Sequence, residues 1–467
     1  MKPSPQIISF TISTLALIFI IASTLSIQGS NGLVEVWLNP YNRSINLLTY
    51  ATPYQNSTQI NQNSWLAINS QPSISTGYGY LPGNFLMYPG RYMAIATFAS
   101  NIEILSINEF NTKNFNTATS SRSPANITKD NKLEDVFLRD IWTGEIVYVS
   151  RNYSSNSNVI YQSKTGSSEN PVVTVDGSVI AYESYAVDLV PNDLNNVKDI
   201  FVFDRSTSIT TRANLPDLVN PSAVTTIEQQ AIGGDSSNPS VCHDGSFIAF
   251  QSQAKNLVVP PVSTTFPYYN IYVRDVANMR TYRVSVGANS TSSSVQETDG
   301  NSINPTISQD CNYVVFESLA TNLVNGDNNA ASDVFRYNIQ TKTLELISST
   351  YKSGSNSTAN GESYGAAVSA DGQVVAFTSV ASDIVNPALE KSKPNAGTLY
   401  IFMRNMSSVG GFVRRVSIDH HTWNQPNGNS QFAALDNSGR FVSYSSQASN
   451  LISHTSNYFS AKARSYT

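Results

Sequence analysis

The sequence predicts an all-β protein, a six-bladed β-propeller whose blades are four-stranded antiparallel sheets. Three observations lead to this fold. One phrase recurs along the chain, an Asp-Gly pair lies between two short apolar runs in its clearest copies, and residues that favour strands are plentiful. Internal repetition on this scale is typical of an array of similar units.

The repeated phrase is clearest in "NPSVCHDGSFIAFQSQAKNL", from Asn238 to Leu257. An Asp-Gly pair between alternating apolar residues is a strong hairpin signal, because a type I′ turn needs positive φ at both central residues. We therefore expect hairpins at Asp176-Gly177, Asp244-Gly245 and Asp371-Gly372. Copies of the phrase begin at Asn170, Asn238, Asn304, Tyr364 and Gln431, with a weaker one at Leu86.

Two more strands are expected after each hairpin. The expected third strands are "DVFLRD" (Asp135), "DIFVFD" (Asp199), "NIYVRD" (Asn270), "DVFRYN" (Asp333) and "LYIFMRN" (Leu399). A four-stranded meander of this kind has two apolar faces, and packing the units side by side buries them.

The two ends of the chain predict how the ring closes. The segment from Val34 to Tyr50 reads as outer strands without a hairpin, and the copy at Gln431 has a hairpin without convincing outer strands. We expect the N-terminal strands to pair with the C-terminal hairpin and complete a sixth blade. Seven blades are the alternative, if 55–79 holds another partial blade.

The N-terminal segment predicts export. An apolar run from Ile7 to Ile27 follows Lys2, so residues 1–30 read as a signal peptide or an uncleaved membrane anchor. Residues 31–467 are then one propeller domain, secreted or extracytoplasmic, and membrane contact is expected only through an uncleaved anchor. In a eukaryote, glycans are expected at the sequons Asn42, Asn56, Asn126, Asn152, Asn289, Asn356 and Asn405.

The two cysteines, Cys242 and Cys311, are expected to be free thiols, because neighbouring blades diverge. Cys311 replaces the Gly of the turn in its copy, where a side chain costs strain. On this reading Cys311→Gly is neutral or stabilising, unless the thiol forms a disulfide.

The repeat pattern, with "NPSV", "DG" and the "DVFLRD"-type strand in fixed order, resembles the TolB-like, WD-repeat-like propeller repeat of many exported proteins. The resemblance covers most of the chain from Val34 to Ile452. It implies a propeller that serves as an interaction platform. The long segment from Asn101 to Asp130 departs from the pattern and is expected to be a surface loop.

Two acidic loops are candidate calcium sites. Each places Asp-x-Asn shortly before a further Asp, and alternate oxygen ligands in a tight loop suit a hard cation such as Ca²⁺. An Asx-rich turn without metal is the alternative. No cofactor is otherwise expected. The candidate ligands are Asp193, Asn195, Asp199, Asp327, Asn329 and Asp333.

The remaining chemistry favours a binding or scaffolding module that recognises a protein or a glycan by one face or by the central channel. Charged residues make up 13% of the chain and the net charge is −5, which argues against nucleic-acid binding. The expected inner strands carry few titratable groups, which argues against a catalytic site built on them. The alternative is a carbohydrate-active hydrolase or lyase with its site in the channel.

Overall fold

The computed structural model describes residues 91–97, 133–140, 145–155, 160–262, 268–290, 295–351, 357–386, 388, 395, 397–406, 412–419 and 424–451, together with the backbone of strands nearer the two termini. These parts of the chain are all-β, with two short 3-10 helices, η3 (Pro221–Ala223) and η4 (Ile227–Gln229). Within them, no helix has the length and apolar character needed to cross a membrane.

Five four-stranded antiparallel sheets follow one another along the described chain, and we number them as blades 1 to 5. Blade 1 contains β4 (Ser73–Ile74), β7 (Tyr92–Thr97), β8 (Asp135–Asp140) and β9 (Ile146–Tyr148). Blade 2 contains β10 (Ser168–Val173), β11 (Val179–Ser184), β12 (Asp199–Asp204) and β13 (Ile209–Arg212). Blade 3 contains β14 (Ser236–Val241), β15 (Phe247–Ser252), β16 (Asn270–Asp275) and β17 (Arg280–Arg283).

Blade 4 contains β18 (Ser302–Ile307), β19 (Tyr313–Ser318), β20 (Asp333–Asn338) and β21 (Thr343–Leu346). Blade 5 contains β22 (Ser363–Val368), β23 (Val374–Ser379), β24 (Tyr400–Asn405) and β25 (Phe412–Arg415). A three-stranded sheet, blade 6, follows with β26 (Ser430–Leu435), β27 (Val442–Ser446) and β28 (Arg464–Tyr466). The remaining strands are β1 (Leu25–Gly29), β2 (Gly32–Leu38) and β3 (Ile45–Leu47) in one sheet, and β5 (Tyr80–Leu81) with β6 (Phe85–Leu86) in another.

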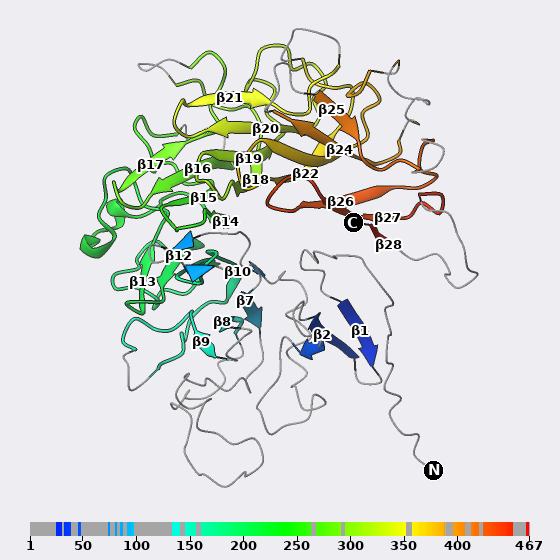
Figure 1. Ribbon diagram of the computed structural model, residues 1–467. Helices are drawn as coiled ribbons and strands as arrows, with labels where there is room; N and C mark the ends of the chain where they lie inside the picture. Colours follow the sequence, from blue (N-terminus) through cyan, green and yellow to red (C-terminus); the bar gives the residue numbers. More distant parts are fainter. Residues whose placement is uncertain are drawn as a thin grey trace, which may run out of the picture.

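The blades form an arc, which runs in Figure 1 from β7–β9 through β14–β17 and β18–β21 to β26–β28. The first strand of each repeat is the innermost, because β10, β14, β18, β22 and β26 lie beside one another from blade to blade. A fan of four-stranded meanders that touch through their first strands is the architecture of a β-propeller. The prediction of an all-β propeller built from four-stranded antiparallel sheets is therefore confirmed.

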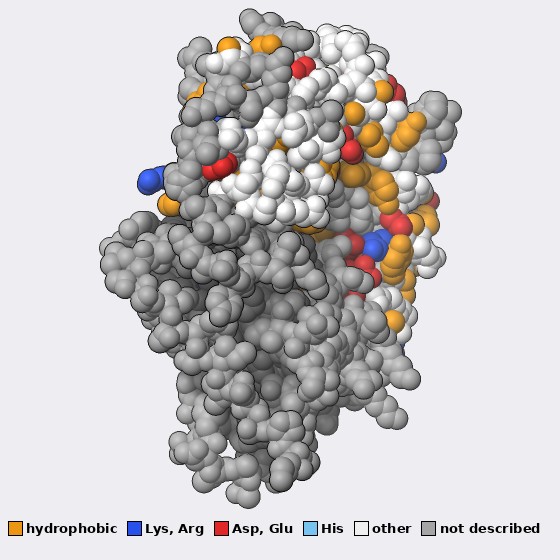
Figure 2. Space-filling view, turned by 90° about the vertical axis from the view of Figure 1, so that its right-hand side faces the viewer, with side chains coloured by type: hydrophobic (Ala, Val, Ile, Leu, Met, Phe, Trp, Pro, Cys, Tyr) orange, Lys and Arg blue, Asp and Glu red, His pale blue; other side chains and the backbone are white. Residues whose placement is uncertain are grey.

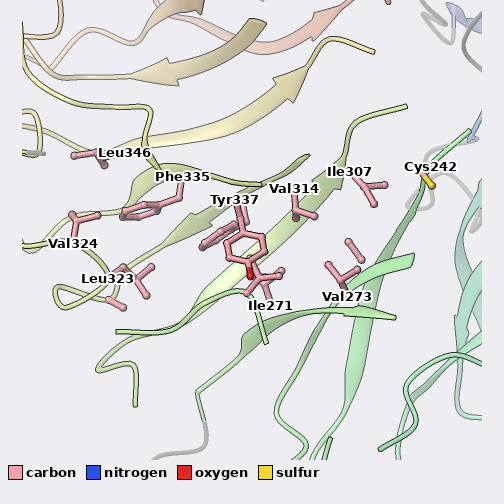
Figure 3. Packing of buried hydrophobic residues seen from close by; sticks show 14 of the residues in the cluster. Cys242, Ile271, Val273, Ile307, Val314, Leu323, Val324, Phe335, Tyr337 and Leu346 are labelled. Atoms are coloured by element: carbon pink, nitrogen blue, oxygen red, sulfur yellow. The ribbon is translucent and has the colours of Figure 1, made fainter. Parts of the chain in front are cut away.

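The hydrophobic core is divided among the junctions between blades. Each junction has its own cluster of buried side chains, as expected if the apolar faces of the meanders pack together. Figure 3 shows the junction of blades 3 and 4, where Ile271 and Val273 of β16 face Val314 and Tyr337. In four blades the second and third strands also stack two aromatic rings, with centroids 5.6–5.9 Å apart.

A pair of buried serines joins the first two strands in five of the blades. In blade 2, Ser168 Oγ donates to Ser184 Oγ at 2.9 Å, and Ser184 Oγ accepts the backbone N–H of Ala186 at 3.0 Å. The other pairs are Ser236–Ser252, Ser302–Ser318, Ser363–Ser379 and Ser430–Ser446. These hydroxyls are satisfied inside the sheet, so they are structural.

The hairpins lie where the sequence predicts them, but the turn type differs. Gly177, Gly245 and Gly372 have φ of +67°, +75° and +67°, whereas the Asp before each of them does not have positive φ. In blade 2, Gly177 N–H donates to Thr174 O at 3.0 Å and Thr174 N–H donates to Val179 O at 3.0 Å. The loop is thus longer than the two residues of a type I′ turn, and only its Gly must be left-handed.

The predicted closure of the ring is not found among the described strands. β2, which contains Val36 and Trp37, pairs with β1 and β3, while β27 pairs with β26 and β28. The outer strand of blade 6 thus comes from the C-terminal residues Arg464–Tyr466, which match the repeat poorly. Antiparallel pairing uses backbone groups, so three residues can join a sheet without the apolar pattern. β1 itself lies inside the segment predicted as a signal or anchor.

The prediction of two free thiols is wrong, because Cys242 and Cys311 form a disulfide with their Cα atoms 5.2 Å apart. The blades do not diverge at the hairpin turns. A Cβ built on the turn glycine Gly439 would lie 3.2 Å from Cβ of Ser369, which precedes the turn of the previous blade. Cys311 and Cys242 occupy the corresponding two positions in blades 4 and 3. Cys311 also keeps the left-handed conformation of the glycine it replaces, with φ of +64°.

The same close approach predicts that Gly245→Val is strongly destabilising. A Cβ at Gly245 would lie 2.8 Å from Cγ2 of Val179 in blade 2, and φ is +75°. We expect a loss of about 1–3 kcal/mol from backbone strain and a similar further loss from overpacking. The measurement is chemical denaturation.

Gly397→Val is the matched control for this substitution. Gly397 has φ of +76°, but no atom lies within 4 Å of a Cβ added there. Gly397→Val should therefore lose stability only through backbone strain, without overpacking. Equal losses at Gly245 and Gly397 would contradict the inter-blade contact.

Candidate functional site: the inner edge of the blades

The inner strands share a β-bulge close to the edge that lies opposite the hairpin turns. In each of blades 2 to 6 the register between the first and second strands shifts at the same place. The bulged residue is left-handed in all five, with φ between +47° and +63°. We call these five residues the bulge rim: Asn170, Asn238, Asn304, Gly365 and Phe432.

The bulge rim is held by side chains of the second strands. The backbone N–H of Asn238 donates to Glu183 Oε2 of the preceding blade at 2.6 Å. Gly365 N–H donates to Glu317 Oε1 at 2.7 Å in the same manner. Between them, Asn304 N–H donates to Gln251 Oε1 at 2.9 Å. The neutral amide of Gln251 thus accepts the same inter-blade hydrogen bond as the carboxylates of Glu183 and Glu317. The role of these two acids is therefore to join neighbouring blades.

The asparagine side chains extend this network. Asn170 Nδ2 donates to Glu183 Oε1 at 3.0 Å, and Asn304 Nδ2 donates to Glu317 Oε2 at 3.2 Å. Asn238 Nδ2 donates to Asn304 Oδ1 of the next blade at 2.9 Å. Asparagine tolerates the left-handed region because its short polar side chain bonds locally, which explains the "NP" of the repeat. Burial raises the pKa of Glu317, although the Gly365 N–H opposes the shift.

One end of the bulge rim is charged. Lys198 Nζ lies 2.9 Å from Glu183 Oε1 and 3.1 Å from Glu169 Oε2. Burial lowers the pKa of Lys198, but the two carboxylates outweigh it and raise the pKa overall. Beside it, Tyr185 is 46% exposed and donates its hydroxyl hydrogen to Asp235 Oδ2 at 2.7 Å. This end can therefore bind polar or charged groups.

The other end of the bulge rim is aromatic. Phe432 is 69% exposed and has φ of +60°, at a position where three blades have Asn and one has Gly. A bulky side chain in this conformation costs about 1–3 kcal/mol, and strain of this kind concentrates at functional sites. The described surface in Figure 2 is mostly uncharged, with hydrophobic side chains in scattered groups. An aromatic ring on such a surface is a natural contact for a ligand.

The predicted calcium ligands fall into two groups with different surroundings. In blade 2, the guanidinium of Arg212 lies 3.1 Å from Asp193 Oδ2 and 3.1 Å from Asp199 Oδ2. Asn195 Nδ2 donates to Asp199 Oδ1 at 3.0 Å. All three ionic side chains are buried. The positive charge that calcium would supply thus comes from an arginine that the sequence reasoning missed.

The group in blade 4 has no such arginine in the part of the chain that the structure describes. Leu346 takes the place of Arg212, since each pairs with the equivalent Phe of the third strand. Asp333 accepts hydrogen bonds from Asn329 Nδ2 at 3.1 Å and from Ser348 Oγ at 2.6 Å. Burial raises the pKa of Asp333 to about 7, although these hydrogen bonds lower it, and burial raises the pKa of Asp327 as well.

The raised pKa of Asp333 predicts a pH dependence of stability. The folded protein holds this proton more tightly than the unfolded chain, whose Asp titrates near about 3.9. The contribution of Asp333 to stability is therefore greatest below about pH 4, falls as the pH rises towards about 7, and is constant above it. Asp333→Asn should remove this pH-dependent loss. In unfolding experiments, the free energy of unfolding of the variant should therefore rise relative to that of the wild type between pH 5 and pH 8. A difference that does not change with pH would contradict the assignment.

The predicted glycosylation sites are only partly within the described residues. Asn289 is exposed, whereas Asn152 and Asn405 are half-buried, and Asn152 Nδ2 donates to Asp188 Oδ2 at 2.8 Å. Asn42, Asn56, Asn126 and Asn356 lie outside the described residues, as does the surface loop expected from Asn101 to Asp130.

Fold and rim together define a β-propeller with a polar and partly aromatic inner edge. No family model matches the chain, and no curated protein matches it. Among solved structures, it is similar to TolB from Acinetobacter baumannii, with 15% identity, a TM-score of 0.32, and coverage of 68% of this chain and 58% of TolB. The chain thus spans about 58% of the length of that TolB.

Two further solved structures are similar at the same level. The periplasmic gluconolactonase PpgL of Pseudomonas aeruginosa has 11% identity, a TM-score of 0.35, and coverage of 91% of this chain and 90% of that one. An oligogalacturonate lyase in complex with manganese has 12% identity, a TM-score of 0.35, and coverage of 67% and 68%. At these identities, the assignment as a propeller rests on the sheet topology of the chain itself.

Proposed function

We propose that this protein is a propeller that binds or scaffolds, and that it recognises a protein or a glycan through the bulge rim. The observation that carries the proposal is Phe432, an exposed ring held at φ of +60° where the sister blades place Asn or Gly. Nothing in the repeat requires an aromatic side chain there, so its strain is most simply explained by contact with a ligand.

The alternative is a carbohydrate-active hydrolase or lyase with a site in the central channel. It would need two carboxylates free to act on a sugar. Glu183 and Glu317 are instead committed to backbone N–H groups of the next blade. In blades 2 to 6, the inner-strand residues between bulge and turn carry no acid or base; they are 171–173, 239–241, 305–307, 366–368 and 433–435. These features support the binding module.

The proposal includes export. The disulfide between Cys242 and Cys311 is typical of an oxidising compartment, which suits a signal or anchor in residues 1–30. We propose six blades, with seven as the alternative because β1–β3 form a meander of their own.

The test of binding uses a matched pair of phenylalanines. Phe432 and Phe412 are both exposed, at 69% and 49%, but Phe412 lies on an outermost strand. Residues 31–467 are immobilised and exposed to a glycan array and to proteins from the exporting cell. We expect a bound species to be lost with Phe432→Ala and kept with Phe412→Ala. Equal binding of the captured species by both variants would contradict the proposal. Turnover of a bound glycan would favour the enzyme.

A second proposal concerns calcium, which we assign to the blade 4 group and not to the blade 2 group. Arg212 already forms ion pairs with Asp193 and Asp199, whereas Asp327 and Asp333 have no ion pair among the described residues. Calcium is expected to raise the melting temperature at pH 8, where Asp333 is ionised. Asp333→Asn should abolish the rise, and an equal rise in this variant would contradict the assignment.

A further inference from the structure

Four side chains of metal-binding type meet at the turns of blades 3 and 4. The ligand atoms of Cys242, Asp244 and Cys311 all lie within 4.8 Å of one another. Asp244 Oδ1 is 3.4 Å from Cys242 Sγ and 3.4 Å from Cys311 Sγ. Nδ1 of His243 is 3.5 Å from Cys311 Sγ. The sulfurs are buried, while His243 and Asp244 are about half exposed, so the group is open to solvent on one side.

Two of these four residues, both cysteines, depart from the repeat at this one junction. Cys242 stands where blades 2, 4 and 5 have Ser or Thr and blade 6 has Asp436. The hydroxyl at this position binds the Asp of the turn, as Ser369 Oγ does at 2.6 Å from Asp371. Cys311 stands where blades 2, 3, 5 and 6 have Gly. His243 stands at a position that is Val, Gln, Ala and Asn in blades 2, 4, 5 and 6. The disulfide accounts for the two cysteines but does not account for the histidine.

We propose that reduction of this disulfide creates a metal site in which Cys242, Cys311, Asp244 and His243 bind one Zn²⁺ ion. Tetrahedral zinc has ligand bonds of about 2.0–2.3 Å, which place neighbouring ligand atoms about 3.3–3.8 Å apart. Three of the six ligand pairs already have separations of 3.4, 3.4 and 3.5 Å. The sulfurs must move apart once the bond between them is broken.

The chemistry of the switch balances. A dithiol reductant gives two electrons and two protons to the disulfide, which becomes two thiols, and the reductant becomes a disulfide. The two thiols release their protons to water when they bind Zn²⁺ as thiolates. His243 Nδ1 gives up its 2.6 Å contact with Gln309 O, but that carbonyl keeps the backbone N–H of His243 at 3.2 Å. Oxidation re-forms the disulfide and releases the metal, so blades 3 and 4 are cross-linked in both states.

The experiment titrates Co²⁺, a coloured substitute for zinc, into the whole protein after reduction with dithiothreitol and anaerobic removal of the reagent. We expect one Co²⁺ per chain, with the thiolate-to-cobalt charge-transfer band and the intense visible bands of tetrahedral cobalt. The oxidised protein should bind none. His243→Ala and Asp244→Asn should each weaken Co²⁺ binding by more than about tenfold. Loss of a residue that only hydrogen-bonds a metal ligand already lowers metal affinity by about that factor.

Asp176→Asn, at the equivalent turn of blade 2, is the control and should leave the affinity unchanged. A second readout is the rate at which a thiol reagent alkylates the two cysteines, which one equivalent of Zn²⁺ should slow strongly in the reduced wild type. Uptake without the charge-transfer band, equal uptake by the oxidised protein, or normal affinity in His243→Ala and Asp244→Asn would each overturn the proposal. Unfolding of the reduced protein despite added Zn²⁺ would overturn it as well.

Discussion

Replacement of Cys242 by serine is expected to lower the free energy of unfolding by about 4 kcal/mol under oxidising conditions. The disulfide closes a loop with a sequence separation of 69 residues, and the entropy of such a loop in the unfolded chain gives this magnitude. Serine itself fits, because Ser369 occupies the same position in blade 5 and its hydroxyl binds the Asp of the turn. The loss therefore reports the cross-link, and denaturant unfolding without reductant measures it.

Cys311→Gly is the informative companion to this substitution. It removes the same cross-link but also replaces a left-handed cysteine, with φ of +64°, by the residue that the other turns use. Relief of that strain should return about 1 kcal/mol, so Cys311→Gly is expected to be less destabilised than Cys242→Ser. In reducing buffer the cross-link is absent from all three proteins, and Cys311→Gly should then be at least as stable as the wild type. Equal stability of wild type and Cys242→Ser without reductant would contradict the disulfide.

Arg212→Leu is expected to cost about 3–5 kcal/mol, because it leaves Asp193 and Asp199 buried without their counter-charge. The side chain of Arg212 is only 2% exposed, so water cannot replace it. Leucine is the residue that blade 4 carries at this position, at Leu346, so shape alone does not forbid it.

The double variant Arg212→Leu with Asp199→Asn separates charge from packing. Removal of one of the two uncompensated carboxylates should recover a large part of the loss if charge is the cause. No recovery in the double variant, or a loss of less than about 1 kcal/mol for Arg212→Leu alone, would contradict the ion-pair account.

The repeat predicted the architecture because each landmark has a local physical cause. Asp-Gly ends one strand and starts the next, and the apolar alternation of strands such as Val179–Ser184 needs a neighbouring sheet on each face. These causes act within about 20 residues, so the hairpins at Asp176, Asp244 and Asp371 could be placed without any knowledge of the ring.

The features that the sequence reasoning missed depend on the distance between blades. Cys242 faces Cys311 because each turn glycine packs on the preceding blade. No local sequence pattern predicts the distance between turns of neighbouring blades. Arg212 reaches Asp193 and Asp199 across its own blade in the same way. For the disulfide and the exposed ring, the signal that could have been used is departure from the repeat, since Cys311 and Phe432 each stand where the sister blades carry other residues. For Arg212 the signal is the repeat itself, because blades 3 and 5 also carry Arg at the equivalent position.

The most direct test of the account measures the stability and the ligand affinity of Phe432→Asn together. Asparagine is the residue of three sister blades at the bulge, so it should relieve the left-handed strain of Phe432 and raise the free energy of unfolding by about 1 kcal/mol. The same change removes the exposed ring, so affinity for the species captured through the bulge rim should fall. Greater stability with weaker binding is the predicted result. Unchanged binding, or a loss of stability, would contradict the claim that the strain at Phe432 serves recognition.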